Sequence, residues 1–149
     1  MTTSPETPGM PRLAAMFAES AATLLVSNGG EHWYAGRGVS DLLRLVHEEP
    51  QVLQGAKVVD KVVGKAAAAL MVIGGVGEVY AFTASRPAVE LLQSHGVKVE
   101  TGLTVGHIEN RSHTGWCPLE TACRDLDTPQ QMLEAITETL QQMKLKQKQ

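Results

Sequence analysis

Residues 58–70, VVDKVVGKAAAAL, place Lys61 and Lys65 directly before a run of alanines and aliphatic residues. Asp60 is a good helix N-cap, and the apolar pattern after it predicts a helix from Lys61 to about residue 73. Because this helix is apolar almost all round after Lys65, we expect it at the centre of the domain. Helix N-termini favour acids and like charges four residues apart repel, so local stability does not explain the two lysines.

The sequence on either side of this helix predicts an α/β domain. Asn28-Gly29-Gly30 lies between two short strand-like runs, which indicates a β-hairpin, and Ser40 begins an amphipathic helix. Residues 78–83 and 97–100 are typical of strands, and the helix between them has Ser85 as its N-cap. Such a strand–helix–strand unit implies parallel strands. We therefore expect a three-layer α/β/α fold with a mixed sheet and helices on both faces.

The remaining segments complete this prediction. Residues 103–108 suggest a further strand, Pro118 opens a short helix, and Thr128 caps a final amphipathic helix.

The two ends of the chain differ in composition from the middle. Residues 1–11 are rich in Pro, Thr and Ser and are predicted to form a flexible leader. Residues 144–149 are predicted to form a polar basic tail, and residues 12–143 a single domain.

Composition excludes several classes of protein. A net charge of −3 and an aromatic fraction of 4% argue against nucleic-acid binding by basic patches or by base stacking. The longest apolar stretch, residues 66–77, is too short to span a bilayer, and the first residues show no signal-peptide pattern. Two cysteines, Cys117 and Cys123, suggest a reducing compartment rather than a disulfide scaffold. We expect a cytoplasmic protein with no membrane partner.

Four segments carry a resemblance to a known family: DKVVGKAAAALMV, EVYAF, HGVKVE and NRSHTGWCPLE. In this order they resemble a small bacterial and archaeal family of unknown function that is placed in the cytidine-deaminase-like superfamily. The resemblance covers residues 13–142. It implies the cytidine-deaminase-like fold and almost no biochemistry.

The zinc-binding motifs of the true deaminases are missing. Those enzymes carry H-x-E at the start of the buried helix and P-C-x-x-C at the start of the next one. Here the corresponding positions read Asp60-Lys61-Val62 and, over residues 84–89, ASRPAV. Without imidazole or thiolate ligands at either place, we expect no zinc, no other metal and no cofactor.

The resemblance implies that two helix N-termini converge where zinc would sit. Lys61, Lys65 and Arg86 would ring that point, with Asp60 and Ser85 as the two N-cap residues. Positive helix ends and cationic side chains favour a negatively charged ligand. We therefore expect this site to bind a small anionic metabolite, such as a nucleotide-like compound. The alternative is that both lysines simply reach into solvent.

The segment that ends in Cys117 is the second candidate part of the site. Asn110 and Arg111 suit a loop that folds over a ligand, and Cys117 stands at a helix N-terminus, which favours its thiolate. A nucleophilic pair of Cys117 with His113 is one alternative. Glu120 either caps backbone N–H groups or acts as an acid or base in the pocket.

Two other functions stay open from the sequence. In the first, the domain is an enzyme in which an activated Lys61 or Lys65, or Cys117, attacks a substrate. In the second, it is an interaction domain with a vestigial site. The resemblance allows a homo-oligomer without fixing the number of subunits.

Overall fold

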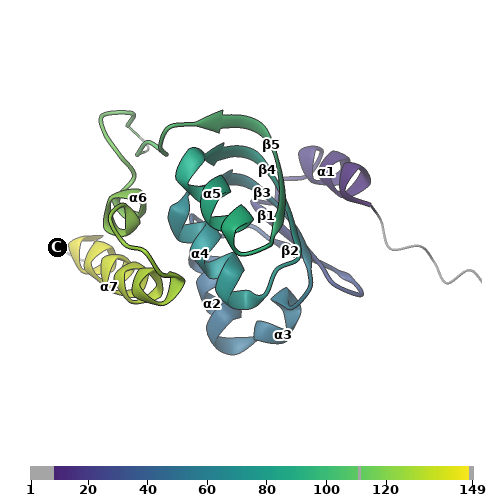
Figure 1. The fold of residues 1–149 in the computed structure, drawn as a ribbon, viewed down its shortest axis with the longest axis horizontal. Coiled ribbons are helices and arrows are strands. Elements are labelled where there is room, and N and C mark those ends of the chain that lie inside the picture. The colour runs from purple at the N-terminus through teal and green to yellow at the C-terminus, as the bar shows by residue number, and fades with distance from the viewer. Residues whose placement is uncertain (1–8, 111, 148–149) are drawn as a thin grey trace, which may run out of the picture.

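The computed structural model describes residues 9–110 and 112–147, which form a mixed α/β fold with a five-stranded sheet flanked by helices (Figure 1). From one edge to the other, the strands are β2 (Glu31–Tyr34), β1 (Leu24–Ser27), β3 (Lys57–Val63), β4 (Glu78–Ser85) and β5 (Lys98–Val105). The helices are α1 (Met10–Ala18), α2 (Ser40–Glu48), α3 (Pro50–Leu53), α4 (Lys65–Gly74), α5 (Arg86–Ser94), α6 (Pro118–Cys123) and α7 (Pro129–Gln147). Strand β1 is antiparallel to β2 and β3, whereas β3, β4 and β5 are parallel.

The predicted hairpin and strand–helix–strand unit are confirmed. Strands β1 and β2 pair around the turn at residues 28–30, and α5 joins the parallel strands β4 and β5. Ser85 caps α5, since its hydroxyl accepts a hydrogen bond from the Ala88 N–H (3.3 Å). Gly96, at φ +77°, follows the helix in the left-handed conformation that favours glycine.

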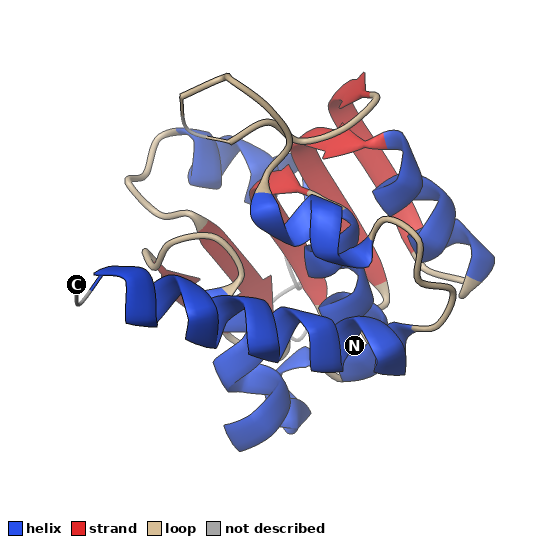
Figure 2. Cartoon of the chain, turned by 90° about the vertical axis from the view of Figure 1, so that its left-hand side faces the viewer, coloured by secondary structure: helices blue, strands red, loops and turns tan. Residues whose placement is uncertain are grey.

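Helix α4 is the predicted central helix. Every residue from Ala66 to Met71 is buried, and the helix packs between the sheet and the outer helix α7 (Figure 1), which is the long helix in front of the sheet in Figure 2. A helix that is apolar on all sides requires such cover on all sides. Helix α7 is the longest at 19 residues, yet no helix in the described part of the chain is long and apolar enough to cross a membrane.

On the opposite face of the sheet, α1 is the one helix that the described residues form (Figure 1). Leu13 and Phe17 of α1 are buried against Leu25 and Val59 of the sheet, and the Phe17 ring stacks on that of Phe82 with 5.7 Å between centroids. The sequence patterns did not predict this helix. It starts at residue 10, inside the stretch expected to be a leader; residues 1–8 lie outside the described part of the chain.

The prediction that a helix starts at Lys61 is wrong. Asp60 and Lys61 lie on β3, and α4 starts only at Lys65, with the extended Gly64 as its N-cap. Valines at four of the seven β3 positions favour a strand, and pairing with both β1 and β4 holds the segment extended. The Asp60 carboxylate accepts a bond from the Val62 N–H (3.4 Å) within this strand and caps no helix.

Two further boundaries differ from those predicted. The segments 97–100 and 103–108 were expected as separate strands, but residues 98–105 form the single strand β5. Pairing with β4 along its length keeps it continuous despite Gly102. Helix α7 extends to Gln147, so it includes most of the segment expected to be a polar tail.

Candidate functional site

A cavity of about 110 Å³ lies where the N-termini of α2 and α4 meet the loop that leads into α6. Almost all of its wall is apolar, and its only polar side chains are a thiol and a carboxylate. The lining residues are Gly38, Val39, Val62, Gly64, Ala66, Ala67, Ile108, Cys117, Leu119 and Glu120. We call this space the α2–α4 cavity.

Glu120 supplies the carboxylate, and it is only 4% exposed. Its Oε1 accepts a hydrogen bond from the Lys65 N–H (2.5 Å), and its Oε2 accepts one from the Ile108 N–H (2.9 Å). The carboxylate therefore caps α4 and ties the loop before α6 to the start of that helix. A helix N-terminus favours negative charge, and here the protein itself provides it.

Gly64 makes this close approach of the carboxylate possible. A Cβ added at this position would lie 2.9 Å from Glu120 Oε1 and 3.2 Å from Ile108 Cγ1. The backbone of Gly64 is in an extended conformation that any residue can adopt. Glycine is therefore required here because a side chain would not fit, and not because of the backbone angles.

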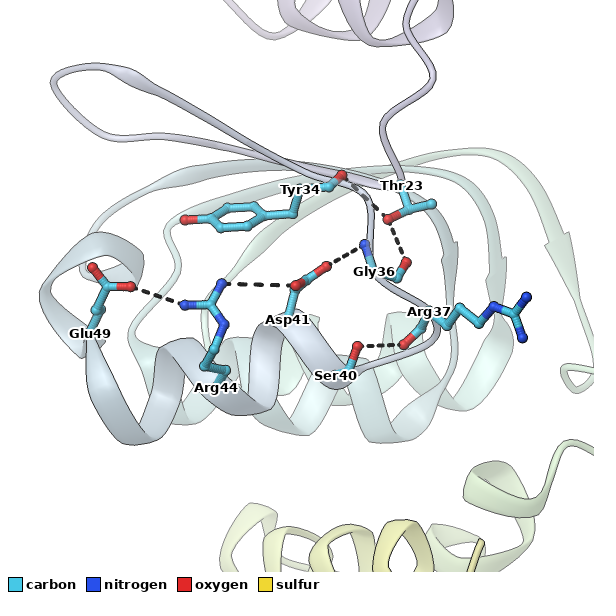
Figure 3. Close-up of polar contacts among 8 residues, drawn as sticks. All are labelled: Thr23, Tyr34, Gly36, Arg37, Ser40, Asp41, Arg44 and Glu49. Atoms are coloured by element: carbon cyan, nitrogen blue, oxygen red, sulfur yellow. Dashed lines mark hydrogen bonds and ion pairs between the residues drawn. The ribbon is translucent and has the colours of Figure 1, made fainter. Parts of the chain in front are cut away.

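A polar network positions the wall that α2 contributes (Figure 3). The Asp41 carboxylate accepts a bond from the Gly36 N–H (2.8 Å), and the Thr23 hydroxyl donates to the Gly36 carbonyl (2.8 Å). The Ser40 hydroxyl donates to the Arg37 carbonyl (2.8 Å). These bonds fix both sides of the turn between β2 and α2, and this turn carries the first two lining residues.

Arg44 supports the same network from the next turn of α2. Its guanidinium pairs with Glu49 (3.1 Å), approaches Asp41 (3.9 Å) and lies 5.6 Å from the centre of the Tyr34 ring (Figure 3). Exposed ion pairs contribute little stability one by one. We therefore expect Arg44 to contribute little to the stability of the turn.

Asn110 shapes the loop and does not line the cavity. Its side-chain oxygen accepts a bond from the Thr114 N–H (3.0 Å), and its side-chain nitrogen donates to the Thr114 hydroxyl (3.1 Å). His113 pairs with Glu109 (2.7 Å) and is exposed, so it forms no pair with Cys117. Arg111, the other predicted loop residue, lies outside the described residues.

An aromatic stack fastens the loop to α6. The rings of His107 and Trp116 lie parallel with 4.4 Å between their centroids, and the Arg124 guanidinium lies 4.8 Å from the centre of the Trp116 ring. Stacked aromatic rings contribute stability beyond that of their buried area, and a cation over the face of a Trp ring contributes further stability. Together with Glu120, these contacts hold the loop wall of the cavity in place.

None of the three predicted cations lines the α2–α4 cavity. Lys61 is exposed on β3, and Arg86 is exposed at the start of α5. The Lys65 ammonium donates to the backbone carbonyls of Arg124 (3.0 Å) and Leu126 (2.9 Å), which follow α6. Lys65 therefore fastens α6 to α4, because a cation near the end of a helix satisfies carbonyls that lack helical partners.

Asp60 and Ser85 lie apart from the cavity lining. Asp60 is a half-buried residue of β3, with Leu24 of β1 and Ala81 of β4 as its neighbours across the sheet. Burial raises the pKa of its carboxyl to about 7, and the nearby Asp41 charge adds a smaller repulsion. Ser85 is fully buried as the cap of α5.

The two cysteines differ in their surroundings. Cys117 is partly exposed and lines the α2–α4 cavity. Cys123 is buried, and burial raises the pKa of its thiol to about 11, which suits an unreactive core residue. Among the described residues, no group of three His, Cys, Asp or Glu side chains is placed to hold a metal ion.

Sequence patterns missed eight of the ten residues that line the cavity. Gly38, Val39 and Val62 are ordinary small or aliphatic residues, and nothing in their spacing marks them as part of a site. Only Gly64, placed between two strand-forming valines and a helix, carries a signal of close packing. Cys117 and Glu120 are the predicted site residues that the cavity contains.

Comparison with known proteins assigns the chain to a family. The family model described as "Domain of unknown function (DUF1893)" matches residues 12–140. The chain belongs to the DUF1893 family. A solved structure of a DUF1893 family protein (TM1506) from Thermotoga maritima is 22% identical, with 87% of this chain and 88% of that chain covered and a TM-score of 0.80. A search of curated proteins found no match.

Membership in DUF1893 confirms the predicted family of unknown function, and the similarity to the Thermotoga structure shows a shared fold alone. The matched region includes every residue that lines the α2–α4 cavity. In this DUF1893 chain the cavity is therefore built entirely within the family domain.

Proposed function

We propose that this DUF1893 domain binds a small molecule in the α2–α4 cavity. The observation that carries the proposal is the cavity itself, an apolar space with one thiol and one carboxylate on its wall. Ligand sites are typically concave and mostly apolar, with a few polar groups that orient the ligand. Three independent sets of contacts, from Asp41, from Glu120 and from the Trp116 stack, hold the walls in position.

The size of the cavity limits the ligand. An engineered apolar cavity of about 150 Å³ takes up benzene, so a space of this size suits a ligand, or part of one, of roughly five or six heavy atoms. Val62, at the rim, is 48% exposed, so a larger ligand would continue past it into solvent.

The charges around the cavity favour a neutral ligand with a hydrogen-bond donor. Glu120 is the only charged side chain of the lining, and its carboxylate oxygens can each accept a further bond. Lys65 is occupied at α6, and Lys61 and Arg86 line no part of the cavity. An N–H or O–H group of the ligand would meet Glu120.

The small anionic metabolite expected from the sequence is the second candidate. It is favoured by one observation: the two residues directly before α2 and the first turn of α4 form part of the cavity wall. Helix N-termini attract negative charge. Glu120 caps the one at α4, whereas at α2 the Asp41 carboxylate of the first turn is bound to the Gly36 N–H. An anion would therefore sit at the α2 side, next to Gly38 and Val39.

An enzymatic role is supported by Cys117 alone among the predicted nucleophiles, because its thiol shares the cavity with the Glu120 carboxylate. A relationship to the cytidine-deaminase-like superfamily is part of our proposal. It is supported by the succession of hairpin, buried helix and parallel strand–helix–strand unit. A cytoplasmic location is proposed as well, and the two free cysteines support it.

Native and denaturing mass spectrometry of freshly purified protein tests the proposal. We would compare the wild type with Val62→Lys, which places a charge at the rim, and with Leu145→Lys, an exposed control on α7. The expected result is added mass under native conditions in the wild type and the control, but not in Val62→Lys. Mass that persists on denaturation and maps to Cys117 would instead support the enzyme.

A thermal-shift panel of small amides, alcohols, carboxylates and phosphate decides the ligand class. The amides and alcohols, which are neutral and can donate a hydrogen bond, are expected to raise the melting temperature of the wild type. They are expected to have less effect on Val62→Lys. Stabilisation by the anions alone would favour the second candidate. A chain that is bare in the native spectrum and is shifted by no compound would contradict small-molecule binding.

A further inference from the structure

Strand β5 leaves one long edge of the sheet open. It pairs with β4 on one side, and no strand or loop of the described chain pairs with its other side (Figure 1). The strand is eight residues long, so its outer side presents a row of backbone N–H and C=O groups. Such a row is a template for a further strand.

The other edge of the sheet is protected, whereas this one is not. Strand β2 has only four residues, and the charged Glu31 is one of them. In β5, residues 101–105, TGLTV, contain no charge and no proline, and the Leu103 side chain is 58% exposed. Natural proteins usually protect a long edge with charges, prolines or bulges. The charges of β5, Lys98 and Glu100, lie before residues 101–105, so this open uncharged stretch indicates that a partner covers it.

A second copy of the same strand fits this edge. In an antiparallel pair with two-fold symmetry about Gly102, Thr101 lies opposite Leu103 of the second copy, and Val99 lies opposite Val105. These four residues carry no charge, so only uncharged side chains meet across the pair at these positions. The hydroxyls of Thr101 and Thr104 lie 2.8 Å apart, so β5 bends between them.

The charges of β5 are compatible with the same register. Glu100 lies opposite Thr104 of the second copy, and Lys98 lies opposite Gly106, so no like charges face each other. Gly102 meets its own counterpart at the symmetry axis. A Cβ on Gly102 would lie 3.5 Å from the Tyr80 hydroxyl, so Tyr80 already covers this glycine from the neighbouring strand.

We propose that β5 pairs antiparallel with β5 of a second copy, which joins the two sheets into one. An identical strand can form hydrogen bonds along the whole open edge. Two-fold symmetry places the β5 edge of each molecule in the same interface, so neither edge stays open. The short β2 at the far edge prevents further growth of the sheet. The partner is therefore another molecule of this chain, and the assembly is a closed dimer.

Sedimentation-equilibrium centrifugation of the full chain over a range of concentrations tests the proposal. Leu103→Lys places a charge in the middle of the pairing, and Leu145→Lys is the matched control, since Leu145 is 64% exposed on α7. We expect a dimer in the wild type and the control, and a dimerisation constant weakened by about tenfold or more in Leu103→Lys. Circular dichroism confirms that the variant is folded.

Hydrogen exchange locates the interface. Amides in residues 101–105 of the wild type are expected to become more protected as the protein concentration rises, and those of Leu103→Lys are not. A wild type that stays monomeric overturns the proposal. So does a dimer that Leu103→Lys leaves intact, or protection of these amides that does not depend on concentration, as a bound foreign strand would give.

Discussion

Glu120 explains why the start of α4 carries no local cap. A helix of ten residues that begins with Gly64 and Lys65 offers its first N–H groups no acceptor from its own sequence. The acceptor comes from Glu120, 55 residues after Lys65, and the lysine ammonium in return binds the carbonyls after α6. The Glu120 side chain therefore binds the start of α4, and the Lys65 side chain binds the backbone that follows α6. Together these bonds hold the two helices against each other without a ligand.

Replacement of Glu120 is expected to destabilise the fold. Glu120→Ala leaves the partly buried N–H groups of Lys65 and Ile108 without their acceptor, which should lower the free energy of unfolding by about 1–3 kcal/mol. Glu120→Gln keeps one acceptor oxygen and should cost less. Urea denaturation measures both; equal stability of Glu120→Ala and the wild type would show that the carboxylate is not the cap.

Asp60 makes stability depend on pH. The pKa of its carboxyl is about 7 in the folded chain and about 3.9 in the unfolded one, so the folded state binds the proton more tightly. Ionisation therefore costs stability as the pH rises from about 4 to 7, and the loss is complete above that range. Asp60→Asn removes this cost and should stabilise the protein by roughly 1–3 kcal/mol at pH 8.

Thermal denaturation of Asp60→Asn and the wild type from pH 4 to pH 8 checks whether ionisation of Asp60 lowers the stability of the wild type as the pH rises. The two melting temperatures are expected to converge near pH 4, where the Asp60 carboxyl is neutral in the folded state. Asp41→Asn is not a suitable control, because Asp41 holds the turn before α2. A difference between the two proteins that is constant across the range would mean that Asp60 does not titrate as described.

At the scale of elements, the boundary between β3 and α4 sets the position of the cavity. The strand runs through Asp60 and Lys61 to Val63, and a single extended glycine separates it from the helix. If the helix began at Lys61, as the sequence suggested, Val62 and Gly64 would lie on a helix and the cavity wall would not exist. The position of this boundary depends on pairing with β1 and β4, which the local pattern does not contain.

Gly64→Ala tests whether this junction is as tight as the structure shows. The added methyl group would meet Glu120 and Ile108, so we expect a loss of about 1–3 kcal/mol in the free energy of unfolding. Gly106→Ala is the control, because a Cβ there has nothing within 4 Å. Chemical denaturation compares the two; equal stabilities would show that the space beside Glu120 is larger than described.

At the scale of the whole molecule, the two faces of the sheet are unequally covered. In the part of the chain that the structure describes, one face carries α4, α5 and the outer helices, whereas the other carries only α1 (Figures 1 and 2). Phe17 anchors α1 through its stack on Phe82 and its contacts with the sheet. The stability of that face therefore depends on a single nine-residue helix.

Phe17→Ala is expected to destabilise the protein by about 3–5 kcal/mol, since the side chain is fully buried and leaves a cavity behind. Leu145→Ala, on the exposed surface of α7, should stay within about 0.5 kcal/mol of the wild type. Urea denaturation of both variants measures the difference. A loss as small for Phe17→Ala as for Leu145→Ala would mean that α1 does not hold this face.

Sequence alone predicts the elements with strong local signals. The hairpin at Asn28, the cap at Ser85 and the central apolar helix all follow from spacing within a short window. Helix α1 was missed because Pro, Gly and Thr before it suggested an irregular segment. The cavity was only partly foreseen, because Val39, Val62 and Glu120 are brought together by chain segments that no local pattern links.

The most direct test of ligand binding is a nitrogen–proton NMR titration of the labelled wild-type chain with the neutral and anionic compounds of the thermal-shift panel. The expected result is chemical-shift changes confined to the amides of Gly38, Gly64, Cys117 and their neighbours in the cavity wall. Changes centred on Lys61 and Arg86 would instead locate the ligand at the dispersed cations. No change with any compound would contradict binding in the α2–α4 cavity.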